Sequence, residues 1–240
     1  MKHLTFQLHG SIVSWGKPGG DEERPSYRYP SKSAVLGLVA ASMGIKRSDC
    51  EEQKELSEGL KFAVTVESPG QEFTDYHTAL PPQKEEAFLA TRKEEINWGT
   101  GNAVVTQRDY RVDSLHTVTL WIPDERGAPD LGEIKESLLS PTFIPYLGRK
   151  SCPPGIPFMP ETLESDSLKE SFCRYWEMRP RSAVLRKLAG EDEITVYWEG
   201  PHPEPGLEAE EKGERKDQPL NRSNWTFRKR SENKSVIESG

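Results

Sequence analysis

Paired cysteines, long apolar runs and an excess of positive charge are all missing from this sequence of 240 residues. Its three cysteines, Cys50, Cys152 and Cys173, are scattered without paired spacing. This excludes a disulfide framework or a zinc site and favours a reducing compartment. No run approaches the roughly 18 apolar residues of a membrane span, and the N-terminus lacks a signal-peptide pattern. We therefore expect a cytoplasmic protein with no membrane partner.

The charge balance restricts the kind of partner. The formal net charge is −7, so any contact with nucleic acid must be local rather than spread over the whole surface. Apolar residues make up 34% and charged residues 30%, which suggests a polar arm or surface buried against partners. HxH, CxxC, DxD and P-loop spacings are missing, so we expect neither a metal nor a cofactor.

Hydrophobic periodicity predicts alternating strands and helices. Strand-like alternation and capped, helix-period stretches give strands over 4–10, 60–68 and 112–122 and helices over 31–45 and from Asp130 to Pro141. Small residues on the first helix (Gly37, Ala40 and Ala41) are typical of a helix pressed closely onto a sheet. The order is most of a β-α-β-β-α-β ferredoxin-like unit in an α+β fold.

Two stretches depart from this regular pattern. About thirty residues from 77 to 109 lie between good strands and lose the periodicity, which favours a projecting hairpin over a structureless loop. Past residue 160 the signal weakens, although 193–200 reads as a strand. The stretch from Glu191 to Glu214 contains nine acidic residues, several prolines and only one lysine. This composition is typical of a solvated loop. We therefore expect an irregular C-terminal extension over 161–240, with a loose final ten residues.

Four basic and aromatic groups stand out against the acidic background. Arginine and lysine offer phosphate contacts, and aromatic rings offer faces on which unstacked RNA bases can stack. The alternative is that each group is an ordinary surface with one packed aromatic, and composition alone does not decide between them. The groups are RPSYRYPSKS (24–33, with Arg24 and Arg28), TQRDYR (106–111), YLGRKS (146–151) and WTFRKR (225–230).

Two of these groups suit an anion particularly well. Ser31, Lys32 and Ser33 begin a helix, whose free N–H groups and dipole attract anions, although an ordinary N-cap explains them equally. In the second group, 146–151, Gly148 would let the backbone approach a ribose-phosphate closely or adopt positive φ. Arg149 and Lys150 would then reach phosphate oxygens, on a loop stiffened by the prolines that follow.

Catalysis has weaker support. His116 shares strand parity with apolar neighbours and reads as a packed histidine. Tyr76 and His77 could handle protons in metal-independent RNA cleavage. Adjacent strand residues point to opposite faces, however, so this pair would converge only at a bend.

The order and wording of these motifs resemble the CasD family, the RAMP-type subunit of the CRISPR surveillance complex Cascade. The likeness covers residues 1 to about 154 and is thin beyond. It rests on SWG (14–16), RPSYRYPSKSAVLGLVAASMGI (24–45), DYHTAL (75–80), RDYRVDSLHTVTLW (108–121) and PYLGRKSCPP (145–154). The resemblance implies an RRM-related ferredoxin-like body over 1–76 and 110–160, with 77–109 as a protruding thumb.

The same resemblance implies a function and partners. Members hold the 5′ handle of the CRISPR RNA (crRNA), contact the CasC backbone subunit and the CasA large subunit, and meet target DNA only through the assembled complex. Together with Arg24 and Arg28, the predicted RNA-binding residues are Ser31, Lys32, Ser33, Arg108, Tyr110, Arg111, Tyr146, Leu147, Gly148, Arg149, Lys150 and Ser151.

The resemblance also bears on catalysis. CasD-like subunits are non-catalytic holders, whereas a branch in another subtype cleaves precursor RNA through a Tyr/His/Lys site. Here no lysine follows His77 at matching spacing, and Lys84 is the nearest one after it. We therefore expect binding without cleavage, and keep a metal-independent endoribonuclease that processes precursor crRNA as the alternative.

Overall fold

The structure is a computed structural model of the chain. It describes residues 1–20, 22–79, 91–97, 102–123, 129–179, 183–189, 193–200, 207–222, 224 and 226–238, apart from the side chains of residues 95, 183, 184 and 186.

Strands dominate the fold. The elements in chain order are β1 (Lys2–Val13), β2 (Trp15–Gly16), β3 (Glu23–Arg24), β4 (Ser26–Tyr27), α1 (Lys32–Met43), α2 (Cys50–Gly59), β5 (Lys61–Ser68), β6 (Gln71–Ala79), α3 (Arg92–Asn97), β7 (Val104–Trp121), α4 (Leu131–Leu139), β8 (Glu161–Glu164), α5 (Leu168–Met178), α6 (Ala183–Leu188), β9 (Glu193–Trp198), β10 (Glu211–Asn221) and β11 (Thr226–Glu238). Of these, β1, β5, β7 and β9 match the strands predicted over 4–10, 60–68, 112–122 and 193–200. The predicted α+β character is confirmed. In the described residues, no helix is long and apolar enough to span a membrane.

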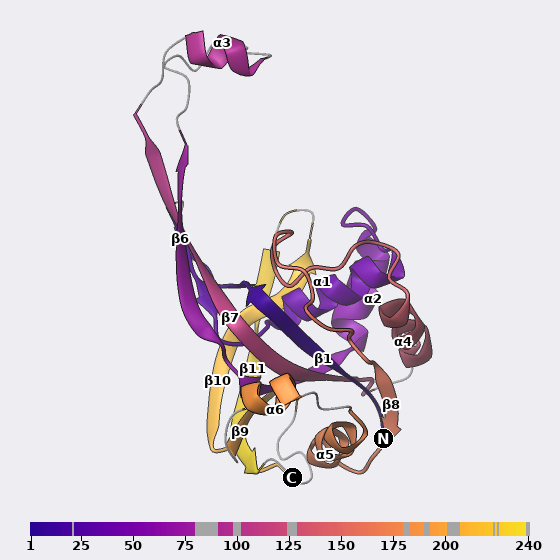
Figure 1. Cartoon of the computed structure of the whole chain (residues 1–240). Helices are drawn as coiled ribbons and strands as arrows, with labels where there is room; N and C mark the ends of the chain where they lie inside the picture. The colour runs from indigo at the N-terminus through magenta and orange to yellow at the C-terminus, as the bar shows by residue number, and fades with distance from the viewer. Residues whose placement is uncertain are drawn as a thin grey trace.

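One large mixed sheet joins most of these strands (Figure 1). Its main row runs β10–β11–β9–β5–β7–β1–β8, and β3 and β6 pair with β7 outside this row. The centre is the antiparallel ladder of β1 with β7, from the pair His3 and Trp121 to the pair Val13 and Arg111. β8, β1, β7 and β5 are consecutive antiparallel neighbours.

The sheet separates two apolar cores because strand side chains alternate between its faces. On β5, Phe62 and Val64 enter the core shared with α1, α2 and α4, whereas Ala63 enters the core shared with α5. Figure 1 shows α1, α2 and α4 grouped on one side of β1 and α5 on the other. The surface beside α1 is therefore remote from α5.

β7 is long enough to belong to two parts of the molecule. Its second half lies in the main sheet, whereas Val104 to Val112 pairs with β6 and projects from the body, with α3 at the far end (Figure 1). At the bend Asp113 has φ +58° and Gly70 has φ +67°, and a Cβ on Gly70 would lie 2.5 Å from the Val112 carbonyl oxygen. The predicted thumb over 77–109 includes 80–90 and 98–101, which lie outside the described residues.

The predicted irregular C-terminal extension is wrong. Residues after 160 form α5, α6 and four strands, and β9 pairs with β5 inside the main sheet. The acidic stretch is not one loop either, since it holds β9 and the start of β10, while 191–192 and 201–206 lie outside the described residues. The final residues up to Glu238 belong to β11 and are not loose.

Cross-strand pairing is the physical reason for this error. The charged ends of β10 and β11 face each other, so Lys229 binds Glu214 at 2.7 Å and Lys234 binds Glu211 at 2.9 Å. An acidic run reads as solvated in isolation, but opposite charges on a neighbouring strand stabilise it as part of a sheet. The partner strand is distant in sequence, so local composition does not reveal it.

Candidate nucleic-acid interface

The N-terminus of α1 is capped as predicted. The Ser31 hydroxyl accepts a hydrogen bond from the Ala34 N–H at 3.1 Å, the role that serine commonly has at this position. The Lys32 N–H, however, donates to Asp217 Oδ2 at 2.9 Å. The positive end of the helix is therefore already partly neutralised by a carboxylate of the chain itself.

The expectation that Lys32 offers an exposed cation to RNA needs correction. Its side chain is 2% exposed, and its ammonium donates to Glu199 at 2.6 Å and to the Leu60 carbonyl at 2.8 Å. Burial lowers the pKa of Lys32, and the adjacent Glu199 carboxylate opposes that shift. Lys32 thus holds the fold together, and Ser31 and Ser33 remain at the surface of the neighbouring cleft.

A buried group of charges fastens β10 and β11 to α1. We call Lys32, Glu199, Asp217, Arg230 and Glu232 the Asp217 cluster. Arg230 donates to both Asp217 oxygens, at 2.6 and 3.1 Å, and to Glu232 at 2.5 Å. Each of these residues is at most 9% exposed, so removal of one partner would leave an uncompensated buried charge.

The 146–151 loop is fixed against the end of β1. The Ser14 N–H donates to the Leu147 carbonyl at 3.1 Å, and the Leu147 N–H donates to the Cys152 carbonyl at 2.7 Å. Gly148 has φ +91°, and a Cβ there would lie 1.6 Å from the Ser14 carbonyl oxygen. Only glycine fits this backbone. Tyr146 is 38% exposed, Leu147 is buried, and Lys150 and Ser151 are exposed.

Arginines gather at the base of the projecting β6–β7 pair. Arg24 of β3 lies beside Arg108 of β7, and Arg149 donates to the Arg24 carbonyl at 3.0 Å. The Arg149 guanidinium lies 4.5 Å from the centre of the Tyr110 ring, a cation–π distance. Arg111 binds Glu72 at 3.2 Å. Arg28, which follows Arg24 closely in the sequence, is exposed.

Several of these guanidiniums retain unused donors. Nε of Arg108, Nε of Arg111 and Nη1 of Arg149 are buried and have no hydrogen-bond partner within the described part of the chain. Buried donors are normally paired. The three side chains of this arginine row are partly exposed as a whole, so the other guanidinium nitrogens are the ones that an acceptor from outside the chain could reach.

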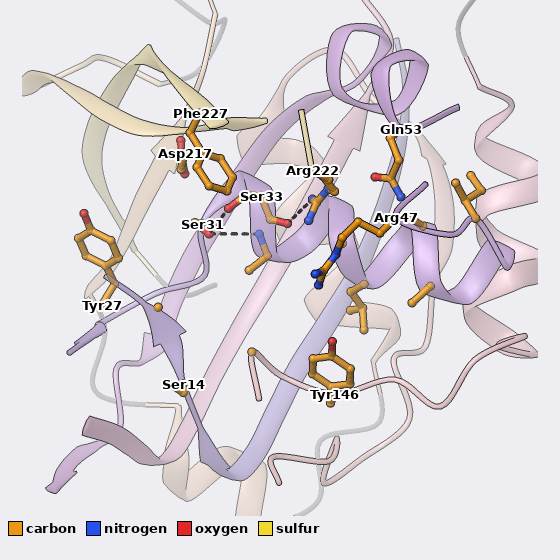
Figure 2. Close-up of a pocket in the computed structure, with 18 of the residues that line it drawn as sticks. Ser14, Tyr27, Ser31, Ser33, Arg47, Gln53, Tyr146, Asp217, Arg222 and Phe227 are labelled. Carbon is orange, nitrogen blue, oxygen red and sulfur yellow. Dashed lines mark hydrogen bonds between the residues drawn. The ribbon is translucent and has the colours of Figure 1, made fainter. Parts of the chain in front are cut away.

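A cleft of about 840 Å³ opens between α1, the 146–151 loop and the β10–β11 pair (Figure 2). The structure brings four of the predicted residues together here: Ser31, Ser33, Tyr146 and Gly148. The remaining predicted residues do not line it, and lie in the arginine row, in the core or on the exposed part of the loop. The two surfaces meet at the 146–151 loop, which contributes to both.

The cleft is strongly positive although the protein is acidic. Among the described residues, its lining has five cationic side chains, Lys17, Lys46, Arg47, Lys216 and Arg222, against one carboxylate, Asp217. That carboxylate is already engaged by Arg230 and the Lys32 N–H. Tyr27, Phe143, Tyr146 and Phe227 add aromatic faces. Cations with aromatic faces are the combination that single-stranded nucleic acid needs.

Comparison with known proteins identifies the family of this chain. A family model described as "CRISPR-associated protein (Cas_Cas5)" matches residues 3–232. The chain belongs to this Cas_Cas5 family. A curated relative, the "CRISPR system Cascade subunit CasD" of Escherichia coli (strain K12), is 30% identical over 183 residues, which cover 72% of this chain and 76% of the relative. The family membership expected from the sequence motifs is confirmed.

Two solved structures share the fold of this Cas_Cas5 protein. A chain of a "CRISPR RNA-guided surveillance complex" matches with a TM-score of 0.65 at 22% identity, over 99% of this chain and 90% of that one. A "Crystal structure of Cas protein" matches with a TM-score of 0.62 at 24% identity, over 99% and 95%. At these identities the likeness supports the sheet-dominated architecture alone.

Sequence reasoning missed most of the positive residues of the cleft in this Cas_Cas5 protein. Lys46 and Arg47 follow the end of α1, where cations are common for helix-dipole reasons, and Arg222 is a lone arginine between β10 and β11. The available signal was the small-residue face of α1. Gly37 and Ala41 line the cleft. Part of the small-residue face that the sequence assigned to sheet packing therefore borders the cleft instead.

The catalytic candidates do not converge. Burial lowers the pKa of His116 to about 3, and its ring lies in the core bonded to Ser114 and Thr65, as the strand parity predicts. His77 lies on β6 and bonds Asp75 at 2.6 Å, while the neighbouring Tyr76 is 65% exposed. Within the described residues, no three His, Cys, Asp or Glu side chains are grouped to hold a metal ion.

We predict that Gly148→Ala destabilises the 146–151 loop strongly. The added methyl group would overlap the Ser14 carbonyl and force a left-handed φ on alanine, at a cost on the order of 2–4 kcal/mol in the free energy of unfolding. Urea unfolding measures this loss. Gly213→Ala is the control, since nothing lies within 4 Å of its Cβ position; equal effects of the two substitutions would contradict the account.

Proposed function

We propose that this Cas_Cas5 protein is a crRNA-binding subunit of a Cascade-type antiviral complex. The observation that carries the proposal is the cleft, whose described lining has five cations and one engaged carboxylate in a chain of net charge −7. The family match and the E. coli Cascade subunit CasD support the assembly. Local positive charge on an acidic protein directs a polyanion to one surface and leaves the rest free for other contacts.

The RNA segment that we assign to this surface is the 5′ handle. A short single strand could run from the cleft, past Tyr146 and Gly148, to the arginine row at the base of β6 and β7. The partly exposed guanidiniums of Arg108, Arg111 and Arg149 suit a sugar-phosphate backbone. Exposed Lys150 and Ser151 lie on this path.

The proposed protein partners are assigned to separate parts of the fold. We propose that β8, β1, β7 and β5 with α1 and α4 form a ferredoxin-like body, and that the projecting β6–β7 pair is its thumb. Exposed apolar residues on the pair, including Phe73, Tyr76 and Val105, suit the neighbouring CasC backbone subunit. The proposal also includes contact with the CasA large subunit, with target DNA reached only through the complex, in the cytoplasm.

We further propose that the subunit is not an enzyme. An RNA-cleaving site needs an acid and a base that reach the same bond. His77 is turned to Asp75, and Tyr76 is its neighbour on a strand, so the two side chains leave on opposite faces.

We predict that the double substitution Arg149→Ala with Lys150→Ala weakens assembly on crRNA and flattens the salt dependence of RNA binding. Each lost phosphate contact lowers the slope of log K against log salt by about one. The matched control is Lys169→Ala with Arg174→Ala on α5, across the sheet. Unchanged complex yield together with an unchanged slope would contradict the clamp at the 146–151 loop.

The nuclease alternative has its own test. We expect the purified protein to leave repeat RNA intact during incubation with EDTA, as resolved by denaturing gel. Cleavage by the natural protein that disappears in His77→Ala would establish the metal-independent endoribonuclease instead. A filter-binding assay without retention of handle RNA would favour a scaffold that binds only protein.

A further inference from the structure

Arg222 extends from the turn after β10 across to α1. Its Nη2 donates to the Ser33 carbonyl at 2.6 Å. Its Nη1 lies 3.1 Å from the position that a Cβ on Gly37 would occupy. The guanidinium therefore rests on the helix backbone where glycine leaves room, and the Arg222 side chain lines the cleft.

A second arginine approaches the same place. Arg47 lies just beyond the end of α1 and lines the cleft, and Figure 2 shows its head group turned toward Arg222 and Tyr146. Burial and then the like charge of Arg47 lower the pKa of Arg222 to about 10, while Tyr146 opposes that fall. Two guanidiniums that raise each other's energy in this way would be stabilised by an anion between them.

The carboxylate of the cleft cannot supply that anion. Asp217 already accepts hydrogen bonds from Arg230 and the Lys32 N–H. The rest of the described lining is cationic, neutral or aromatic. A phosphate group from outside the chain matches two guanidiniums that line one cleft, because its oxygens accept charge-assisted N–H bonds from arginine.

We propose that Arg47 and Arg222 together bind one phosphate group of the RNA backbone against the Gly37 side of α1. This deepens the proposed function, on which it rests for the identity of the RNA. It adds the turn between β10 and β11 to the binding surface. The sequence pattern singled out the nearby group 225–230 but not Arg222. The adjacent aromatic rings of Tyr146 and Phe227 leave space for the attached nucleotide.

The test uses the full-length protein with two probes. One probe is a single-stranded octaribonucleotide with the handle sequence, titrated at several salt concentrations and compared with a peptide nucleic acid of the same sequence that has no phosphates. The other probe is inorganic pyrophosphate, followed by its effect on the melting temperature. The variants are Arg47→Gln, Arg222→Gln and both together, with Arg174→Gln on α5, across the sheet, as control.

We expect each single variant to weaken octaribonucleotide binding about tenfold and to reduce the salt slope by about one. The double variant should bind no more than about twofold more weakly than either single variant, because both arginines serve the same phosphate. The substitutions should leave binding of the peptide nucleic acid unchanged, and the Arg174→Gln variant should bind the octaribonucleotide as the natural protein does. Pyrophosphate should raise the melting temperature of the natural protein and not that of the double variant.

Three results would overturn the inference. Single variants within twofold of the natural protein would exclude a phosphate contact, and losses that multiply in the double variant would assign the arginines to separate phosphates. Loss of pyrophosphate stabilisation in Arg174→Gln would place the anion elsewhere. Pyrophosphate stabilisation without octaribonucleotide binding would support the anion site and contradict the proposed RNA function. Arg47→Gln keeps the test valid if Arg222→Gln is unstable, since Arg47 is exposed.

Discussion

The carboxylate of Asp217 connects parts of the chain that are nearly 200 residues apart. It accepts hydrogen bonds from the Lys32 N–H at the start of α1 and from Arg230 of β11. Lys32 in turn binds Glu199, just after β9. Buried charges of this kind are costly unless all partners are present, so the cluster favours one arrangement of the C-terminal strands beside α1. The cleft exists because that arrangement sets β10 and β11 as its second wall.

The same interaction explains the charge distribution. Acidic residues of the C-terminal part are used internally, in the Asp217 cluster and in cross-strand pairs such as Lys229 with Glu214. The lining of the cleft is left with unbalanced cations. A short RNA strand can be held there by a protein of net charge −7, and the remaining acidic surface discourages nonspecific binding of other nucleic acids.

Local patterns predicted much of this molecule. Alternation in 4–10, 60–68 and 112–122 and the serine cap of α1 correspond to real elements, because these signals depend on neighbouring residues. The likeness of RPSYRYPSKSAVLGL and YLGRKSCP identified the family. Gly148 adopts positive φ, one of the two roles expected for it.

The failures share one physical origin, which is contact between residues distant in sequence. Lys32 appeared as a free cation because Glu199 is 167 residues away. The C-terminal part appeared irregular because β9 needs β5, and β10 needs the charges of β11. Arg222 had no local signal, since its role depends on Gly37 and Arg47 across the cleft.

The central claim is that RNA lies in the cleft between α1 and the β10–β11 pair and continues over the 146–151 loop. Photo-cross-linking of 4-thiouridine-substituted handle RNA in the assembled complex, with peptide mapping by mass spectrometry, tests it directly. The account predicts cross-links in peptides that contain Tyr146 and Phe227. Cross-links confined to the α5 face of the sheet, in peptides such as that around Arg174, would contradict it.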